Sequence, residues 1–138
     1  LEVALAADFI VASTTARFAD THAKWALTPV WGMSQRLPRR IGVSTAKRMM
    51  FTGATLKAEE ALRVGLAEVV LDNEHFIQEV AQICKTIVDN SSFTHAANKT
   101  LLETTDGKSL DGGLQWEVYA SEGVGPDMQA RIAAFNKK

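Results

Sequence analysis

The pattern of hydrophobic and polar residues divides the chain into two parts. In the first part, short apolar runs typical of buried strands alternate with segments of helical periodicity. In the second part, every segment has helical periodicity and no further strand is indicated. We therefore expect an α/β protein whose strands all lie in residues 1–71 and whose residues 72–138 form a helical region.

Glycine and proline residues mark the boundaries of the elements expected in the first part. The predicted strands cover residues 9–13, 16–19 and 66–71. The predicted helices cover residues 1–7, about 34–41, 44–52 and 57–64. Pro29 interrupts the loop 27–34, and Ser34 is the candidate N-cap of the next helix. Gly42, Gly53 and Gly65 each follow a helix, as expected for C-terminal caps.

The second part begins with an apolar stripe at helical spacing. The stripe consists of Phe76, Ile77, Val80, Ile83, Cys84 and Ile87. It predicts a helix from Asp72 or Asn73 to about residue 88. Further helices are expected over residues 92–104, 110–122 and 126–137, with Pro126 in a first turn.

Two features of the sequence suggest a piece of a longer protein. The chain opens with "LEVALAA", which favours helix from its first residue, and it has no initiator methionine. The predicted strands are also too few for a sheet, because strand N–H and C=O groups need neighbouring strands. We therefore expect either missing sequence or a partner that completes the sheet.

Composition excludes several classes of protein. The chain has 138 residues, a net charge of −1 and a hydrophobic share of 46%. These values are ordinary for a globular domain and indicate neither a nucleic-acid partner nor a membrane surface. The single cysteine, Cys84, cannot form a disulfide within the chain, and we expect it to be an inert core residue. One free cysteine suits a reducing compartment, so we predict a cytoplasmic location.

Several short sequences resemble those of one enzyme family. In order along the chain, they are "LEVALAADFIVA", "ARF", a proline turn followed by "QRLPRRIG", then "TG" and "EALRVGLAEVV". Together they resemble the C-terminal half of the crotonase superfamily, the enoyl-CoA hydratase/isomerase family. The resemblance is strongest over residues 1–71. It implies a partial crotonase-like ββα spiral over 1–71, and a helical region over 72–138 that assembles a homotrimer or a dimer of trimers.

The resemblance also implies a reaction. Such enzymes act on acyl-CoA thioesters through an enolate that two backbone N–H groups stabilise. It implies that both donors lie outside this chain, so we expect residues 1–138 alone to be inactive. Coenzyme A would be part of the substrate, with no separate cofactor. The whole protein is then expected to be an enoyl-CoA hydratase or isomerase. The alternative is a non-catalytic acyl-CoA-binding or assembly subunit of the same fold.

Two residues are the candidate catalytic groups. Glu2 matches the first family glutamate, which holds and activates water; without the resemblance it is simply an acidic residue in a first helical turn. His22 falls where hydratases carry their second glutamate, the acid that protonates the α-carbon. Imidazole can act as acid or base near neutral pH, but it departs from the family pattern. Asp20 could orient His22 or replace it, and the simplest alternative is a loop histidine without a catalytic role.

The resemblance implies a Gly- and Ala-rich turn where this chain has bulky residues. Val30, Trp31 and Met33 surround Gly32, and Trp25 lies nearby in sequence. We expect Trp25, Val30, Trp31 and Gly32 to shape the acyl-CoA site, with core filling as the alternative for the large side chains. Tyr119 and Lys138 match residues that cover the CoA of a neighbouring subunit. Their alternatives are interface core for Tyr119 and a frayed terminus for Lys138.

The remaining polar residues carry no strong signal. We expect Arg36, Arg39 and Arg40 to form a solvated helix face with local ion pairs. His75 and His95 show no metal-ligand spacing, so no metal site is predicted. The sequence "DGGLQ" follows no strand and is not a dinucleotide-binding motif.

Overall fold

A computed structural model of the protein describes residues 1–136. The chain forms two compact units, a first unit Leu1–Gln82 and a second unit Ile83–Lys138. The division falls inside helix α4 (Phe76–Asp89) rather than after residue 71. The predicted division into a spiral part and an oligomerisation part is a functional one and stays a prediction.

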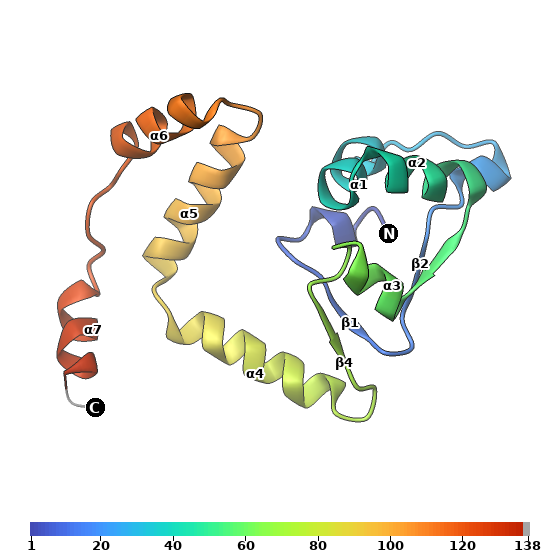
Figure 1. The fold of residues 1–138 in the computed structure, drawn as a ribbon. Coiled ribbons are helices and arrows are strands. Elements are labelled where there is room, and N and C mark those ends of the chain that lie inside the picture. The colour runs from blue at the N-terminus through green and yellow to red at the C-terminus, as the bar shows by residue number, and fades with distance from the viewer. Residues whose placement is uncertain (137–138) are drawn as a thin grey trace. The chain divides into compact units, whose positions relative to one another are not determined.

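The strands of the first unit form two small sheets (Figure 1). Strand β1 (Val11–Ser13) pairs in parallel with β4 (Val69–Leu71), and β2 (Arg17–Ala19) pairs antiparallel with β3 (Thr55–Lys57). Strands are thus present within the three predicted segments. Strand β3 was not predicted, because its three residues follow Gly53 closely and only Leu56 among them is buried.

Short helices connect these strands. They are η1 (Ala4–Ala6), η2 (His22–Trp25), α1 (Met33–Ile41), α2 (Val43–Thr52) and α3 (Ala58–Arg63). The predicted helix over residues 1–7 is wrong in extent, since only one 3₁₀ turn forms there. The prediction of Ser34 as N-cap is also wrong, because α1 already begins at Met33 and is preceded by Gly32.

Helix α1 contributes one apolar face to the core of the first unit. Met33, Leu37 and Ile41 follow one another at four-residue spacing and are all buried. They belong to the same hydrophobic cluster as the buried residues Leu5, Ile10, Ala12, Ala46, Met49, Leu56, Ala61, Leu66 and Ala67. Burial of this face fixes how α1 lies against η1 and α2.

Arg40 lies beside the buried face of α1 and ties this helix to distant backbone. Its guanidinium donates to the carbonyl oxygens of Ala7 at 3.2 Å and Asp8 at 3.1 Å, and it pairs with Glu68 at 3.2 Å. Glu68 in turn accepts the backbone N–H of Ile10 at 2.7 Å. The prediction of a solvated helix face with local ion pairs is wrong for Arg40, because its side chain is only 16% exposed and its ion-pair partner lies 28 residues away.

The second unit is entirely helical in its described part. After α4 come α5 (Ser92–Thr105), α6 (Leu110–Tyr119) and α7 (Met128–Phe135). The four predicted helices are confirmed, but the starts of α4 and α7 differ. Asp72 accepts the N–H of Glu74 in a turn before α4, and Pro126 precedes α7 instead of lying in its first turn.

Polar contacts join α7 to the connection between α4 and α5. Arg131 donates to the carbonyl oxygen of Asp89 at 2.8 Å and pairs with Asp127 at 2.5 Å. Ser91 donates to the other oxygen of Asp127 at 2.9 Å. Hydrogen bonding from Arg131, with a smaller contribution from Ser91, holds the pKa of Asp127 below its usual value.

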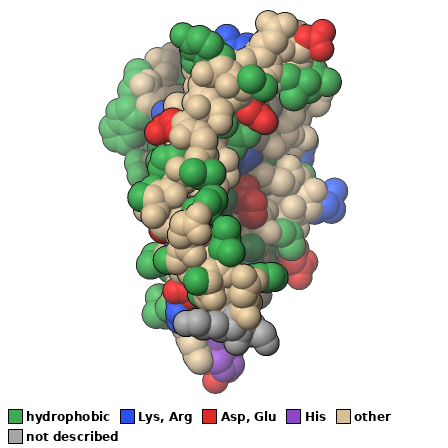
Figure 2. All heavy atoms as spheres, turned by 90° about the vertical axis from the view of Figure 1, so that its left-hand side faces the viewer, with side chains coloured by type: hydrophobic (Ala, Val, Ile, Leu, Met, Phe, Trp, Pro, Cys, Tyr) green, Lys and Arg blue, Asp and Glu red, His purple; other side chains and the backbone are tan. Residues whose placement is uncertain are grey.

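No residue of the described part of the second unit is buried. Its exposed large apolar side chains include Ile87, Val88, Leu102, Leu110, Leu114, Val118, Tyr119, Val124, Ile132 and Phe135. Figure 2 shows hydrophobic side chains distributed over the face turned to the viewer.

Cys84 is exposed as well, so its expected place in a core is wrong for the chain alone. Among residues 1–136, no helix has the length and apolar character that crossing a bilayer requires.

Candidate functional site

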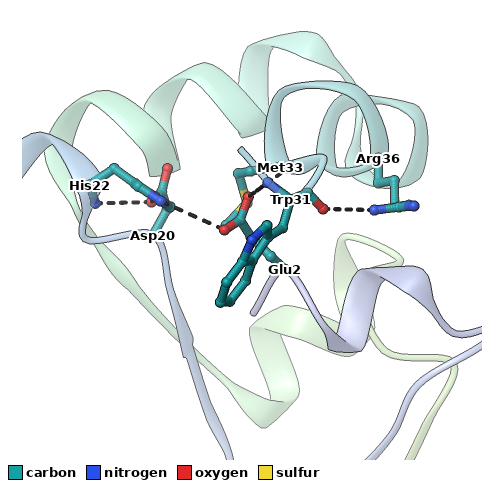
Figure 3. Close-up of polar contacts among 6 residues, drawn as sticks. All are labelled: Glu2, Asp20, His22, Trp31, Met33 and Arg36. Atoms are coloured by element: carbon teal, nitrogen blue, oxygen red, sulfur yellow. Dashed lines mark hydrogen bonds and ion pairs between the residues drawn. The ribbon is translucent and has the colours of Figure 1, made fainter. Parts of the chain in front are cut away.

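Glu2 lies in the turn before η1 and is 9% exposed. Its Oε1 accepts the backbone N–H groups of Trp31 and Met33, both at 3.2 Å (Figure 3). The first N–H groups of a helix have no partner inside the helix, so the start of α1 is a suitable place for a carboxylate. Two donors on one oxygen fix the side chain and leave Oε2 free of these contacts.

The turn that supplies these donors depends on Gly32. Its φ of +96° lies in the left-handed region, which side chains disfavour. On the other side of the Trp31 residue, the carbonyl oxygen accepts a hydrogen bond from Arg36 Nη1 at 2.7 Å. The backbone of Trp31 is therefore held from both directions, by Glu2 and by Arg36 (Figure 3).

His22 is the first residue of η2 and faces Glu2. Its Nε2 lies 3.7 Å from Glu2 Oε2. Its Nδ1 forms a close hydrogen bond with Asp20 Oδ1, and the same oxygen accepts the His22 backbone N–H at 3.1 Å. Asp20 is only 2% exposed. The imidazole thus lies between a buried aspartate and a nearly buried glutamate.

The 3₁₀ turn that carries His22 is held at its far end. Ala26 adopts a left-handed conformation with φ of +53°, and the N–H of Leu27 donates to the His22 carbonyl at 3.1 Å. The stem of Lys24 lies against Gly53 at the end of α2, where a Cβ would come within 2.4 Å of Lys24 Cε. These contacts fix the backbone from which the imidazole extends.

A cavity of about 160 Å³ opens over this cluster, lined by Glu2, Asp20, His22, Trp31 and Met33 together with Leu1, Val3, Ala19 and Thr21. The structure therefore brings together five of the residues singled out from the sequence, namely Glu2, Asp20, His22, Trp31 and Met33. The Trp31 side chain is 67% exposed, so the core-filling alternative is wrong for it, whereas Met33 is 1% exposed and does fill the core.

Other expected site residues lie outside the cavity. Val30 and Trp25 are 79% and 71% exposed and do not line it, and Gly32 acts through the backbone turn. Tyr119 belongs to the second unit, where it is 80% exposed and its ring centroid lies 5.4 Å from that of Trp116. Lys138 lies outside the described residues.

Sequence reasoning missed the part that Arg36 plays. Its side chain was assigned to a solvated helix face, yet it holds the backbone carbonyl of Trp31. The available signal was its position in the first turn of α1, where a long side chain can reach back to the preceding turn. The hydrogen bonds from Trp31 and Met33 to Glu2 had no sequence signal, because backbone groups supply them.

One group of possible metal ligands occurs among the described residues. Ligand atoms of Asp72, Glu74 and His75 lie within 4.8 Å of one another, a proximity that the sequence spacing did not indicate. All three residues are exposed, and exposed acidic groups often lie close together without an ion. The cluster by itself does not assign a metal site.

The Glu2–His22 pair provides an acid and a base side by side. A carboxylate can accept a proton from water or from carbon, and an imidazole can donate or accept one near neutral pH. Because both groups line the same cavity, a small substrate group there could contact both at once. The arrangement is suited to moving protons to and from a bound molecule.

Comparison with known proteins identifies the family of the chain. The sequence profile of the family described as Enoyl-CoA hydratase/isomerase matches residues 1–124. A short-chain-enoyl-CoA hydratase of Clostridioides difficile is 32% identical over 116 residues, which are 84% of this chain and 75% of the relative. A protein of the same name from Clostridium acetobutylicum is 31% identical, over 99% of this chain and 53% of its own length.

Solved structures show the same fold. The crystal structure of an enoyl-CoA hydratase from Bacillus anthracis matches with a TM-score of 0.89 and 33% identity, over 96% of this chain and 52% of that one. The chain thus spans only about half the length of this relative and of the one from C. acetobutylicum. Its α/β architecture is crotonase-like, and the chain belongs to the enoyl-CoA hydratase/isomerase family.

Proposed function

We propose that the protein containing this chain acts on acyl-CoA thioesters as an enoyl-CoA hydratase or isomerase, with Glu2 and His22 as its acid–base pair. The observation that carries the proposal is the 3.7 Å approach of His22 Nε2 to Glu2 Oε2 in a cavity both residues line. The relatives named as enoyl-CoA hydratases support the choice of substrate class.

The pair can supply both proton transfers that hydration of an enoyl thioester requires. Glu2 Oε2 accepts a proton from water as the water oxygen bonds to the β-carbon of the enoyl thioester. The thioester becomes an enolate, and protonated His22 delivers a proton from Nε2 to the α-carbon. Transfer of a proton from Glu2 back to His22 restores the pair. In an isomerisation, the same two groups would remove a proton from one carbon and return one to another.

The proposal assigns only part of the site to this chain. The cavity of about 160 Å³ is smaller than the roughly 300–1,000 Å³ of typical small-molecule sites. We propose that the chain corresponds to the C-terminal half of such an enzyme. The enolate-stabilising N–H donors would then come from outside residues 1–138, and Tyr119 would cover the CoA of a neighbouring subunit. Coenzyme A is part of the substrate, and no separate cofactor is proposed.

The assembly and the location are proposals of the same kind. A homotrimer or a dimer of trimers would cover the apolar side chains that the second unit exposes. A cytoplasmic location rests only on the single cysteine of the chain.

A second function is favoured by two departures from the family pattern. His22 stands where the resemblance implies a glutamate, and the largely exposed indole of Trp31 lines the cavity. A protein with these changes could bind acyl-CoA without converting it. In that case the fold would serve as a binding or assembly subunit.

Hydration of crotonyl-CoA by the whole protein distinguishes the two functions. We expect turnover in the wild type and a fall in kcat of about 10²–10⁴ in Glu2→Gln and in His22→Gln, because general acid–base catalysis contributes that much. His75→Gln is the matched control, since His75 is exposed and does not line the cavity. Tight binding of crotonyl-CoA without turnover by the wild type would support the second function and refute the first.

A further inference from the structure

We propose that Asp20 is a positioning residue that fixes the tautomer of His22, so that Nε2 is the atom which exchanges a proton across the cavity. The catalytic meaning of this assignment rests on the proposed function. The tautomer itself does not, because it follows from the hydrogen bonds of Asp20 alone.

The burial of Asp20 requires hydrogen-bond donors nearby. A carboxylate that is 2% exposed has lost nearly all of its water, and an ionised group in that situation needs other donors. Among residues 1–136, two donors reach its Oδ1, and both come from His22, one from the backbone N–H and one from the ring nitrogen Nδ1. One carboxylate oxygen therefore sets both the backbone and the ring orientation of the histidine.

The direction of the ring hydrogen bond decides the tautomer. An ionised carboxylate can only accept hydrogen bonds, so His22 Nδ1 must carry the hydrogen in its contact with Asp20. In the neutral imidazole, Nε2 then has a free lone pair, and on protonation it gains the second hydrogen. The nitrogen whose protonation changes is the one that faces Glu2.

Glu2 is arranged in a corresponding way. Its Oε1 is occupied by the N–H groups of Trp31 and Met33, while Oε2 lies nearest His22 Nε2. The separation of 3.7 Å exceeds the 2.7–3.2 Å range of a direct N–H···O hydrogen bond. A water molecule or a substrate group in the cavity beside the two atoms can lie within hydrogen-bond distance of both and exchange protons with them. Asp20 thus orients His22 by a hydrogen bond, and the N–H groups at the start of α1 orient Glu2 in the same way on the other side of the cavity.

Removing the acceptor tests the assignment. Asp20→Leu has similar bulk but no oxygen, and Asp20→Ala gives a second variant with little bulk in case the leucine does not fold. Asp20→Asn can keep a carbonyl oxygen at the Oδ1 position, so it is the conservative variant. Asp72→Leu is the matched control, because Asp72 also accepts the N–H two residues later but is exposed and does not line the cavity.

The first measurement is independent of activity. Solid-state ¹⁵N NMR of the histidine-labelled whole protein, at alkaline pH where free histidine is neutral, distinguishes the two tautomers. The His22 signals are identified by their loss in His22→Gln. We expect hydrogen on Nδ1 in the wild type, in Asp20→Asn and in Asp72→Leu, and a shift of hydrogen to Nε2 in Asp20→Leu and Asp20→Ala.

The second measurement is the kinetics of crotonyl-CoA hydration. We expect kcat to fall by about 100-fold in Asp20→Leu and Asp20→Ala with KM within about twofold of wild type, and Asp20→Asn to retain most of the activity. An unchanged tautomer in folded Asp20→Leu or Asp20→Ala overturns the assignment, and so does a changed tautomer with unchanged kcat. If the wild type shows the Nδ1–H tautomer but no turnover, the tautomer assignment stands and the proposed function fails.

Discussion

At the scale of single residues, His22 fits a site that is built around an imidazole. Its two ring nitrogens contact different carboxylates, Asp20 at Nδ1 and Glu2 at Nε2. The resemblance implies a glutamate at this position. The buried Asp20 changes that expectation, since a carboxylate at position 22 would have no hydrogen to donate to it from its side chain.

We therefore predict that His22→Glu lowers both stability and activity. Asp20 would keep only the backbone N–H donor and face a like charge, and losing a hydrogen bond to a charged group costs about 1.5–3 kcal/mol. The free energy of unfolding and kcat for crotonyl-CoA measure the two effects. The double variant Asp20→Asn with His22→Glu, which removes one charge, should regain part of both. A single variant more active than wild type would contradict this account of the site.

The sequence predicted those parts of the candidate site that consist of side chains, but not those that consist of backbone groups. Glu2 and His22 were singled out by resemblance, and the structure places them 3.7 Å apart. Their catalytic roles stay predictions. What fixes Glu2 could not be foreseen, because its two donors are backbone N–H groups whose direction depends on a turn. Val30 was expected at the site because it falls in the turn that the resemblance implies, and Trp25 because it is close in sequence, but both side chains are exposed.

At the scale of elements, the turn from Val30 to Met33 joins a buried helix start to the candidate catalytic residue Glu2. The burial of Met33 anchors the start of α1, and the left-handed Gly32 directs the N–H groups of Trp31 and Met33 toward Glu2. Serine is a common N-cap residue, yet the Ser34 side chain accepts a hydrogen bond from Gln35. The N–H of Met33 donates to Glu2 instead. A cap supplied by a distant residue leaves no mark in the local sequence.

The turn can be tested with two glycine substitutions. Gly32→Ala and Gly42→Ala both place a side chain at positive φ, and each should destabilise the protein by about 1–2 kcal/mol. At Gly42 the new Cβ meets nothing within 4 Å, whereas at Gly32 it would come within 2.3 Å of Arg36 Nη1. Arg36 would then release the Trp31 carbonyl, so only Gly32→Ala should also lower kcat. Equal effects of both variants on kcat would show that the turn does not position Glu2.

The elements that the sequence predicted wrongly, β3 and the segment 1–7, are both determined by contacts with residues distant in sequence. Helices α1 to α7 were all predicted, because each extends over more than one turn and most adjoin a glycine, proline or capping residue. Strand β3 is held by its partner β2, with Phe18 opposite Leu56, and three residues are too few for a pattern. The segment "LEVALAA" favours a helix locally, but it forms only a 3₁₀ turn while Glu2 bonds to the backbone of Trp31 and Met33. Contacts distant in sequence decided both cases.

At the scale of the whole molecule, the two units differ in how far each buries its apolar residues. The first unit has a core of buried residues that runs from Leu5 to Ala67. The described part of the second unit has none, although its helices carry many large apolar side chains. The indole N–H of Trp116 is also buried without a hydrogen-bond partner among the described residues. The exposed apolar side chains are the stronger indication, since apolar surface gathered in this way marks contact sites, so a further protein surface would complete this unit.

We predict that a second and a third copy of the whole protein provide that surface, giving a trimer or a dimer of trimers. Val118 on α6 is 81% exposed, and Val118→Glu should weaken the assembly because burying an unpaired charge costs several kcal/mol. Gln129→Glu on α7 is the control, since it adds the same charge at an exposed position that is already polar. Light scattering at micromolar concentration should show the assembly in wild type and in Gln129→Glu, and smaller species in Val118→Glu. A wild-type protein that is monomeric under these conditions would rule out the assembly, and the apolar faces of the second unit would then need another partner.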